Sequence, residues 1–338
     1  MKKVLVAMSG GVDSTAAALI LKNGGYDVTG VTLLLSDNEK EAKDAETVAK
    51  MIGIPHVTLD LKKEFEKLVK KPFIDAYIAG ETPNPCVICN KRIKFGLLGD
   101  YADENGFDFI ATGHYVGVTE FNGHKVLRRA GDGRKDQSYV LWQLSEDRIA
   151  KLIFPLSDMS KEEIRKIAAS AGLPNAEKKD SQDICFIPDG DYAAFIEKTV
   201  GATKKVGDFV DVNGNIIGRN NGIINFTIGQ RKGLGMGFGE PMYVLDKDVH
   251  ANTVTLGTND ELFKSEVTIR DANISEAFDL SETFNVKIRY SQKSTAAKIY
   301  PDGEFYKIKF EEPVRAPAKG QSAVIYFGDL LAGGGFII

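Results

Sequence analysis

The chain has 338 residues, of which 43% are hydrophobic and 27% charged, and its formal net charge is −4. This length predicts two or three domains rather than one, and the net negative charge excludes nucleic-acid binding by bulk attraction, although local basic patches can still serve. The N-terminus leads directly into an apolar strand, and no long apolar run follows. We therefore expect no signal peptide, no association with a membrane, and a cytoplasmic location.

The first predicted elements are a strand, a glycine turn and a helix. An apolar run, Val4–Met8, precedes the motif Ser9-Gly10-Gly11-Val12-Asp13-Ser14, and a helix-forming run follows it. Backbone N–H groups at a helix N-terminus favour an anion, and glycine lets a phosphate approach the backbone. Ser9 and Ser14 add hydroxyl donors, and Asp13 could hold a metal ion on the phosphates. A tight turn without a ligand is the alternative. The motif resembles the SGGxDS loop of ATP pyrophosphatases, which split ATP between its α and β phosphates.

Residues 1 to about 115 alternate between strand-like and helix-like segments. We predict strands at 28–35, 56–60 and 107–112, and helices at 40–51 and 65–78. This order is typical of an α/β fold with a doubly wound parallel sheet. Ligands of such sheets bind at the carboxyl ends of the strands, where the glycine loop, Leu33 and Thr112-Gly113-His114 are expected to lie.

In the rest of the chain the spacing of hydrophobic residues changes twice. Residues 140–198 have a helical pattern, with a capping box at Ser160–Glu163 and a helix expected to run to Ala171 before Gly172. From about residue 203 hydrophobic residues recur at every second position, as in strands, beginning with a hairpin around Asn213-Gly214. We predict an ATP-binding catalytic domain at 1–200, a small central β domain at 203–263 and a C-terminal β-barrel at 264–338.

The three cysteines, Cys86, Cys89 and Cys185, are too few and odd in number for a structural disulfide framework. A helix predicted to begin near Asn90 would place Cys89 at its positive end and lower the pKa of the thiol. Buried structural thiols, a redox pair, a zinc site and persulfide chemistry remain open. An ATP loop that activates an oxygen, together with reactive thiols, favours sulfur transfer.

Nine sequence blocks follow one another along nearly the whole chain: residues 7–14, 80–85, 89–95, 111–115, 135–139, 179–186, 227–234, 289–290 and 320–324. Together they resemble the family of tRNA-specific 2-thiouridylases. The resemblance implies ATP-dependent thiolation at C2 of the wobble uridine of tRNA. It also implies a nucleotide-binding domain, a small central domain and a barrel that helps to grip the anticodon arm. A cysteine desulfurase or a sulfur-relay protein is implied as the sulfur donor.

The resemblance also implies roles for single residues. Cys185 would carry the persulfide, and Cys89 would be its partner thiol, which either releases sulfide or forms a disulfide with Cys185. ATP, with Mg²⁺, would bind to Ala7, Met8, Ser9, Gly10, Gly11, Val12, Asp13, Ser14, Leu33 and Gly113. The target base would face Asn84, Pro85 and Cys86, and tRNA would contact His114, Lys135, Asp136, Gln137, Arg289, Tyr290 and Gln321.

Cys86 departs from the family pattern, which has at this position an aspartate with a proton-handling role. An alternative interpretation makes Cys86, Cys89 and Cys185 thiolate ligands of an iron–sulfur cluster with one iron open to external sulfide. Three further alternatives concern function: an ATP pyrophosphatase that makes an amide or another nucleobase derivative, a thiolase for another tRNA position, and a non-catalytic tRNA-binding protein with a relic nucleotide fold. Release of pyrophosphate from ATP that depends on tRNA would distinguish an enzyme from a binding protein.

Overall fold

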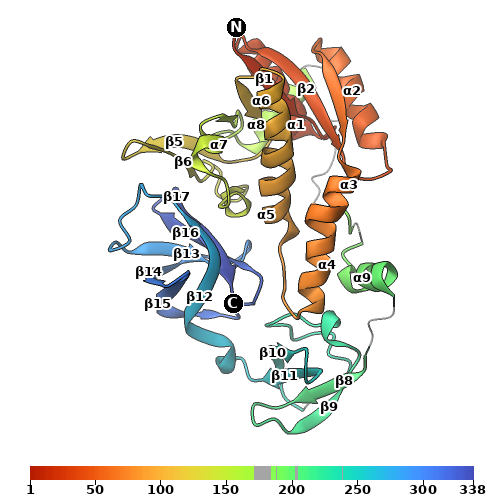
Figure 1. Cartoon of the computed structure of the whole chain (residues 1–338), viewed down its shortest axis with the longest axis vertical. Helices are drawn as coiled ribbons and strands as arrows, with labels where there is room; N and C mark the ends of the chain where they lie inside the picture. The colour runs from red at the N-terminus through yellow and green to blue at the C-terminus, as the bar shows by residue number, and fades with distance from the viewer. Residues whose placement is uncertain (171–183, 188, 202–204, 238) are drawn as a thin grey trace.

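The structure is a computed structural model that describes all residues except 171–183, 188, 202–204 and 238. Its first sheet is parallel and has the strand order β3-β2-β1-β4-β7 (Figure 1). This order reverses between β1 and β4, which places a topological switch point at their carboxyl ends. The strands are β1 (Lys3–Ala7), β2 (Asp27–Leu34), β3 (His56–Asp60), β4 (Phe109–Ala111) and β7 (Leu152–Ile153).

Helices cover both faces of this sheet, so the predicted doubly wound α/β fold is confirmed. Side chains of β1 alternate between the two faces: Val4 and Val6 join one core and Leu5 joins the other. The first core is closed by α1 (Val12–Asn23), α2 (Lys40–Ile52) and α8 (Lys161–Ser170). The second core includes side chains from α6 (Leu98–Glu104) and α7 (Glu146–Ile149).

Two long helical columns lie on the second side of the sheet and extend beyond it (Figure 1). The first contains α3 (Lys62–Phe65), a π-helical segment (Glu66–Lys70) and α4 (Lys71–Ile78), where the sequence predicts a helix at 65–78. The second begins with α5 (Pro85–Cys89) and continues through a π-helical segment (Asn90–Leu97) into α6.

The predicted start of the second column, near Asn90, is wrong by five residues. Proline is favoured at the first position of a helix because its fixed φ fits and its missing N–H has no partner to lose there, and Pro85 takes this position. Asn84 caps the helix through its Oδ1, which accepts from the backbone N–H of Cys86 at 3.1 Å. Cys86 therefore lies in the first turn, and Cys89 lies at the end of α5.

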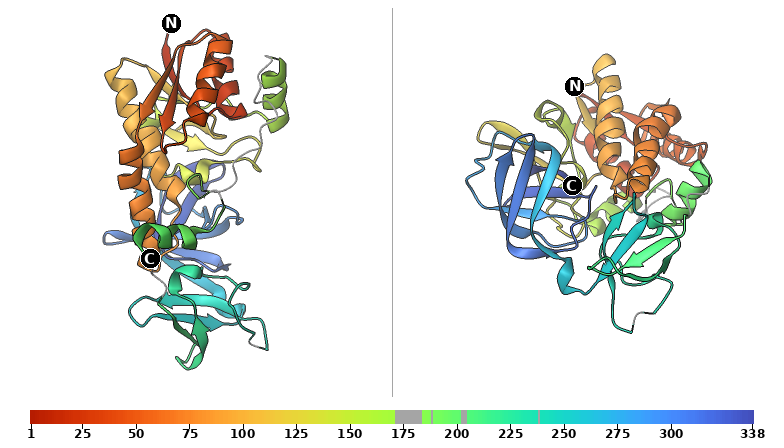
Figure 2. Two further views of the ribbon diagram at one scale, coloured as in Figure 1. Left: turned by 90° about the vertical axis from the view of Figure 1, so that its right-hand side faces the viewer. Right: turned by 60° about the horizontal axis from the view of Figure 1, so that its bottom comes forward.

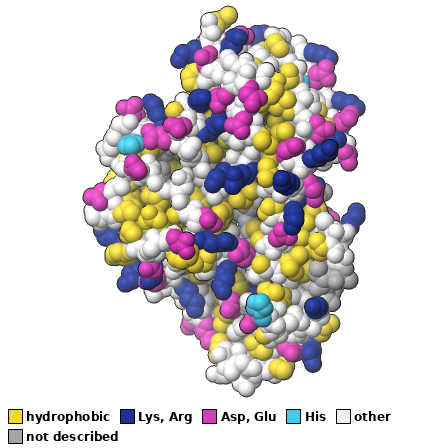
Figure 3. All heavy atoms as spheres, viewed as in Figure 1, with side chains coloured by type: hydrophobic (Ala, Val, Ile, Leu, Met, Phe, Trp, Pro, Cys, Tyr) yellow, Lys and Arg dark blue, Asp and Glu magenta, His cyan; other side chains and the backbone are white. Residues whose placement is uncertain are grey.

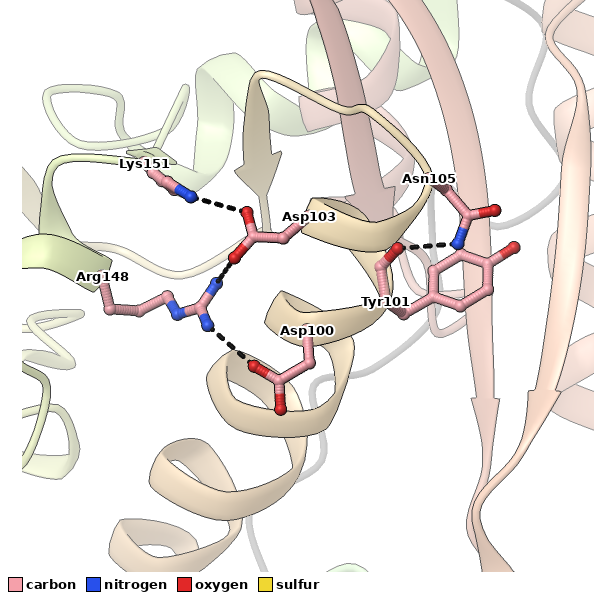
Figure 4. A network of polar contacts seen from close by, with 6 residues as sticks. All are labelled: Asp100, Tyr101, Asp103, Asn105, Arg148 and Lys151. Carbon is pink, nitrogen blue, oxygen red and sulfur yellow. Dashed lines mark hydrogen bonds and ion pairs between the residues drawn. The ribbon is translucent and has the colours of Figure 1, made fainter.

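The helical pattern predicted for residues 140–198 misses the edge strand β7. This strand follows α7, whose Arg148 donates to Asp100 and Asp103 of α6, and Lys151 donates to the same Asp103 (Figure 4). The ion pairs fasten the edge of the sheet to α6. The predicted capping box of α8 is confirmed, because Ser160 N–H donates to Glu163 Oε2 at 2.7 Å. Ala171 and Gly172 lie outside the described residues.

The second sheet is small and lies at the end of the molecule farthest from the parallel sheet (Figure 2). The predicted hairpin forms its β8 (Gly207–Val210) and β9 (Ile216–Asn220), which pair antiparallel. The strand order is β10-β11-β8-β9, with β10 (Tyr243–Asp248) and β11 (Thr253–Gly257). Helix α9 (Tyr192–Val200) precedes this sheet and packs on α4, where Tyr192 stacks on Tyr77 at 4.5 Å between ring centroids.

The third sheet closes into the predicted C-terminal β-barrel. Its strands form a ring in the order β12-β15-β14-β13-β16-β17, and β17 pairs back with β12. A closed ring removes the exposed strand edges of an open sheet. The strands are β12 (Phe263–Ile274), β13 (Phe284–Lys287), β14 (Thr295–Asp302), β15 (Phe305–Arg315), β16 (Ser322–Phe327) and β17 (Leu330–Ile337).

A hairpin that the sequence analysis did not predict joins the barrel to the first domain. Strands β5 (Gly117–Phe121) and β6 (His124–Arg128) follow the parallel sheet, and Arg128 pairs with Leu330 of β17 (Figure 1). Trp142 also enters this contact, because its Nε1 donates to Ser322 Oγ at 3.0 Å. In the described part of the chain, no helix is long and apolar enough to cross a bilayer.

Candidate active site

The glycine loop connects β1 to α1 as the sequence predicts. Gly10 has a positive φ of 69°, and a side chain there would meet Glu41 and Asp44 of α2. The hydroxyl of Ser14 accepts from the backbone N–H of Ser9 at 3.2 Å and donates to Gly11 O at 3.1 Å. Gly11 is the N-cap residue of α1 and provides no side-chain cap. The loop therefore turns into a helix N-terminus whose dipole favours an anion.

Gly113 lies against this loop from the other side of the switch point. A Cβ at Gly113 would sit only 2.8 Å from the backbone N of Ser14 and 2.9 Å from the carbonyl carbon of Asp13. Only glycine allows so close an approach of two backbones. The structure thus brings Gly113, predicted to bind ATP, next to the predicted phosphate loop. Leu33, on the neighbouring strand β2, is partly buried and packs against the adjacent core.

Asp13 is held by two side chains whose roles the sequence analysis missed. Lys161 Nζ lies 2.8 Å from both carboxylate oxygens, and the hydroxyl of Tyr115 donates to Oδ1 at 2.8 Å. Lys161 lies inside the capping box, which predicted a helix start but gave no indication of this contact. Helix α8 thereby brings a cation to the first turn of α1, where phosphate charge would have to be neutralised.

The three cysteines gather at the second helical column although Cys185 is remote in sequence. Cys89 is 7% exposed and packs in a core with Phe65, while Cys86 and Cys185 are exposed. Phe186 brings the Cys185 segment to this place, since its ring lies 5.6 Å from that of Phe65 between centroids. Cys185 is therefore anchored beside the Cys-x-x-Cys helix by the aromatic residue that follows it.

The expected lowering of the Cys89 pKa is wrong for this conformation. Burial raises the pKa of Cys89 to about 12, and the neighbouring Cys185 and Cys86 add to the rise. Partial loss of solvation also raises the pKa of Cys86 and of Cys185, and the negative charge of a Cys86 thiolate adds to the rise at Cys185. One cation opposes these effects at all three thiols: Lys94 lowers each of their pKa values.

We expect the thiols to differ in their rates of alkylation. A thiol with a pKa of about 12 is ionised to roughly one part in ten thousand at pH 8, and the thiolate is the reactive form. Cys89 should therefore react with iodoacetamide much more slowly than Cys86 and Cys185 in the native protein, and the difference should disappear in denaturant. Peptide mass analysis over time measures the order. Alkylation of Cys89 first would contradict the burial seen here.

The thiols do not form a ready-made metal site. In the described ranges, no group of three His, Cys, Asp or Glu residues is placed to hold a metal ion. A three-cysteine cluster site needs all its thiolates directed at one point; the three thiols are close enough to raise one another's pKa but are not placed as such a group. This arrangement does not fit the iron–sulfur interpretation.

The residues predicted to contact tRNA near the glycine loop are mostly committed to contacts within the protein. His114 is buried and its Nδ1 lies 2.7 Å from Thr112 Oγ1, and burial lowers the pKa of His114 well below its usual value, so the ring is neutral. Asp136 accepts from the hydroxyl of Ser138 at 2.8 Å. Gln137 Oε1 accepts from the backbone N–H of Tyr115 at 2.9 Å. These three side chains order the segment that follows β4.

The predicted tRNA contacts on the barrel lie where the barrel meets the other domains. Arg289 donates to the backbone oxygens of Ile228 and Ala316 at 2.8 and 2.9 Å. The hydroxyl of Tyr290 donates to Asp136 O at 3.2 Å, and this residue is 45% exposed. Gln321 Nε2 donates to the backbone oxygen of Thr82 at 2.7 Å. Tyr290 is thus the best placed of these for an outside partner.

Positive charge gathers locally in spite of the net charge. On the face shown in Figure 3, Lys and Arg side chains cluster across the middle of the molecule, between the barrel and the parallel-sheet domain. The exposed Arg92 and the half-buried Lys91 belong to the π-helical segment that follows Cys89. Such a cluster is what an otherwise acidic protein needs to hold a phosphate backbone.

A doubly wound sheet with a glycine loop at its switch point, followed by a small β domain and a closed barrel, defines a three-part α/β protein of the HUP class. Three family models match it consecutively: the tRNA methyl transferase HUP domain at residues 2–189, the tRNA methyl transferase PRC-barrel domain at 193–258, and the aminomethyltransferase beta-barrel domain at 264–337. The chain belongs to the family of tRNA-specific 2-thiouridylases, as its sequence blocks predict.

Full-length relatives support this assignment. The chain is 44% identical to the tRNA-specific 2-thiouridylase MnmA of Clostridium acetobutylicum, over 99% of both proteins. It is 45% identical to that of Treponema denticola, over 99% of this chain and 97% of the relative. A solved 4-thiouridine synthetase in complex with RNA and ATP covers 59% of this chain and 50% of its own, at 17% identity and a TM-score of 0.38, which is too low to support an argument.

Proposed function

We propose that this enzyme replaces the C2 oxygen of the wobble uridine in tRNA by sulfur, with ATP as the activating substrate. The placement of Cys185 beside the Cys-x-x-Cys helix carries the proposal, because a sulfur relay needs two thiols that can meet. Family membership supports the substrate, since the relatives are named as tRNA-specific 2-thiouridylases.

The first step is adenylation of the base. The uracil O2 attacks the α-phosphorus of ATP, a new C2–O–P bond forms, and pyrophosphate leaves. The loop at residues 7–14 and Gly113 would bind the nucleotide, with backbone N–H groups on its phosphates. Asp13 is suited to hold Mg²⁺, which proteins bind through one or two carboxylates plus substrate phosphates and which would neutralise charge on the pyrophosphate. Lys161, already at Asp13, would add a cation for the same charge.

The second step transfers sulfur. The terminal sulfur of a persulfide on Cys185 attacks C2, and AMP leaves with the former C2 oxygen. Cys89 as thiolate then attacks the Cys185 sulfur and breaks the S–S bond. The outer sulfur stays on C2 of the base as 2-thiouridine, and a Cys89–Cys185 disulfide forms. A thiol reductant must return two electrons before the next cycle. In the other order, Cys89 attacks first and frees sulfide, which then attacks C2.

Cys89 must become more acidic during this cycle than it is in the present conformation. Its raised pKa comes mainly from burial, and Lys94 is the cation that favours its ionised form. Entry of the substrate or a shift of the helix would have to expose the thiol to this cation or to water. Cys86, as thiol rather than carboxylate, would line the base pocket with Asn84 and Pro85.

The substrate has to be a base outside any stack, since its C2 must be reachable by both ATP and sulfur. In this proposal the domain at 1–200 carries out the chemistry, and the barrel at 264–338 binds the anticodon arm. The small central domain spans 203–263. Lys135, Arg289, Tyr290 and Gln321 remain the proposed tRNA contacts of this grip, together with the segment 136–137. A persulfide-donating desulfurase or relay protein would charge Cys185.

The test is mass analysis of tRNA nucleosides after incubation of unmodified tRNA with the enzyme, ATP and a persulfide donor. We expect 2-thiouridine to appear, together with AMP and pyrophosphate, and none of it without ATP. An iron-free preparation should be fully active, because the thiols do not fit a cluster site. A preparation that thiolates only after iron and sulfide are added would contradict the persulfide route.

A further inference from the structure

The segment that carries the proposed base pocket lies between the end of α4 and the start of α5 and contacts the barrel. Arg270 of β12 donates through Nη2 to Glu81 Oε1 at 2.9 Å, across 189 residues of sequence. The backbone N–H of Thr82 donates to Lys319 O at 2.7 Å, and Thr82 O accepts from Gln321 at 2.7 Å. Both backbone polar groups of Thr82 are thus held by one turn of the barrel.

The geometry of that turn requires its glycine. Gly320 has a positive φ of 83°, and a Cβ there would lie 2.8 Å from Glu81 Cβ and 3.2 Å from the backbone N of Thr82. The barrel turn therefore lies too close to Glu81 and Thr82 for a side chain at position 320. Thr82 is 7% exposed, so these hydrogen bonds are shielded from water and leave little freedom at this residue.

Rigid residues connect this contact with the site. Pro83 and Pro85 fix two of the three φ angles between Thr82 and Cys86, and Asn84 caps the helix that holds the cysteines. A displacement at Thr82 is therefore passed to Asn84 and Cys86 rather than absorbed. A misplacement of about 1 Å of a reacting group can lower a rate about a hundredfold.

We propose that the barrel positions the base pocket for sulfur transfer through a clip formed by Glu81, Arg270 and Gln321. The clip acts through Thr82 and the two prolines that follow it, so Arg270 and Gln321 are positioning residues rather than catalytic ones. This inference rests on the proposed thiolation, and it assigns the barrel a role in the chemistry besides holding tRNA.

A double-mutant cycle tests the clip. Arg270→Met and Glu81→Gln should each lower kcat for thiolation about tenfold and leave KM for ATP unchanged, because the glycine loop lies elsewhere. The double variant should also lose about tenfold rather than a hundredfold, since each change breaks the same contact. Arg270→Lys should recover most of kcat, because it restores the cation. Single variants with unaltered kcat, or losses that multiply, would overturn the proposal.

A second measurement keeps this test separate from the proposed function. Hydrogen exchange at residues 80–86 should rise in Arg270→Met and Glu81→Gln, whatever the enzyme catalyses. If exchange responds in this way while wild type makes no 2-thiouridine, the clip holds and the proposed function fails. Unaltered exchange would overturn the clip. Arg219→Met is the matched control, because it removes an ion pair to Asp208 at 2.8 Å within the central sheet and should change neither kcat nor exchange at 80–86.

Discussion

Cys185→Ser is expected to abolish formation of 2-thiouridine while pyrophosphate release from ATP in the presence of tRNA stays within about threefold of wild type. Serine keeps the size of the side chain but cannot carry a sulfane sulfur, so adenylation proceeds and transfer stops. Because the side chain is exposed and lies at a turn, the substitution should not alter folding. Nucleoside mass analysis and a pyrophosphate assay on the same reaction separate the two steps.

Cys86→Ser is the matched control for this variant, because Cys86 is also exposed and lies in the same cluster. We expect it still to form 2-thiouridine, because the proposed relay uses only Cys89 and Cys185, and any loss should fall on KM for tRNA, because Cys86 would line the base pocket. Full activity of Cys185→Ser would overturn its role as sulfur carrier. Equal and complete loss in both variants would indicate that the three thiols act as one unit, against the two-thiol relay proposed here.

Asp13→Ala is expected to lower pyrophosphate release at least about a hundredfold and to leave tRNA affinity nearly unchanged. Removal of a group that stabilises charge on a phosphoryl group during its transfer typically lowers the rate by about this factor. The change also leaves Lys161, whose side chain is only 13% exposed, without its carboxylate. Loss of this partner at a largely buried cation destabilises the fold, so thermal unfolding must be measured beside the kinetics.

Two comparisons make the Asp13 result specific. Asp13→Asn keeps the shape and a hydrogen-bond acceptor for Tyr115 but removes the charge, and it should be nearly as slow as Asp13→Ala. Asp100→Ala removes a carboxylate that pairs with Arg148 at 3.1 Å, remote from the glycine loop, and should leave catalysis unaltered. If Asp13→Ala still released pyrophosphate at the wild-type rate, the interpretation of the loop as an ATP site would be wrong.

The sequence predicted most of the fold because its signals are local. The alternation of strands and helices, the capping box at Ser160 and the hairpin around Asn213 each depend on neighbours within a few residues, and the structure contains all of them. Strand β7 was missed because its pairing partner β4 lies elsewhere in the chain. The β5–β6 hairpin is local, and its turn Asn122-Gly123 is a favoured hairpin signal that was overlooked. β7 has only two residues, too few for any period to be visible.

In the candidate site, too, local motifs could be predicted and contacts made by packing could not. The glycine loop and the cysteines could be found from motifs, but Lys161 and Tyr115 reach Asp13 only through the packing of α8 on α1 and the turn after β4. The pKa of Cys89 could not be predicted, since a helix start five residues earlier and the aromatic residues around the thiol decide it. Burial depends on how the whole core packs and therefore cannot be read from a four-residue motif.

The hydrogen bond between Trp142 and Ser322, which are 180 residues apart, has a consequence for biosynthesis. The first domain leaves the ribosome with Trp142 and the edge of β6 uncovered, and both stay so until β16 and β17 have been translated. Nascent chains paused before that point would expose an unpaired strand and a large indole, which are features that attract chaperones or other nascent copies. Maturation of this enzyme is therefore expected to be a late, concerted event rather than a domain-by-domain one.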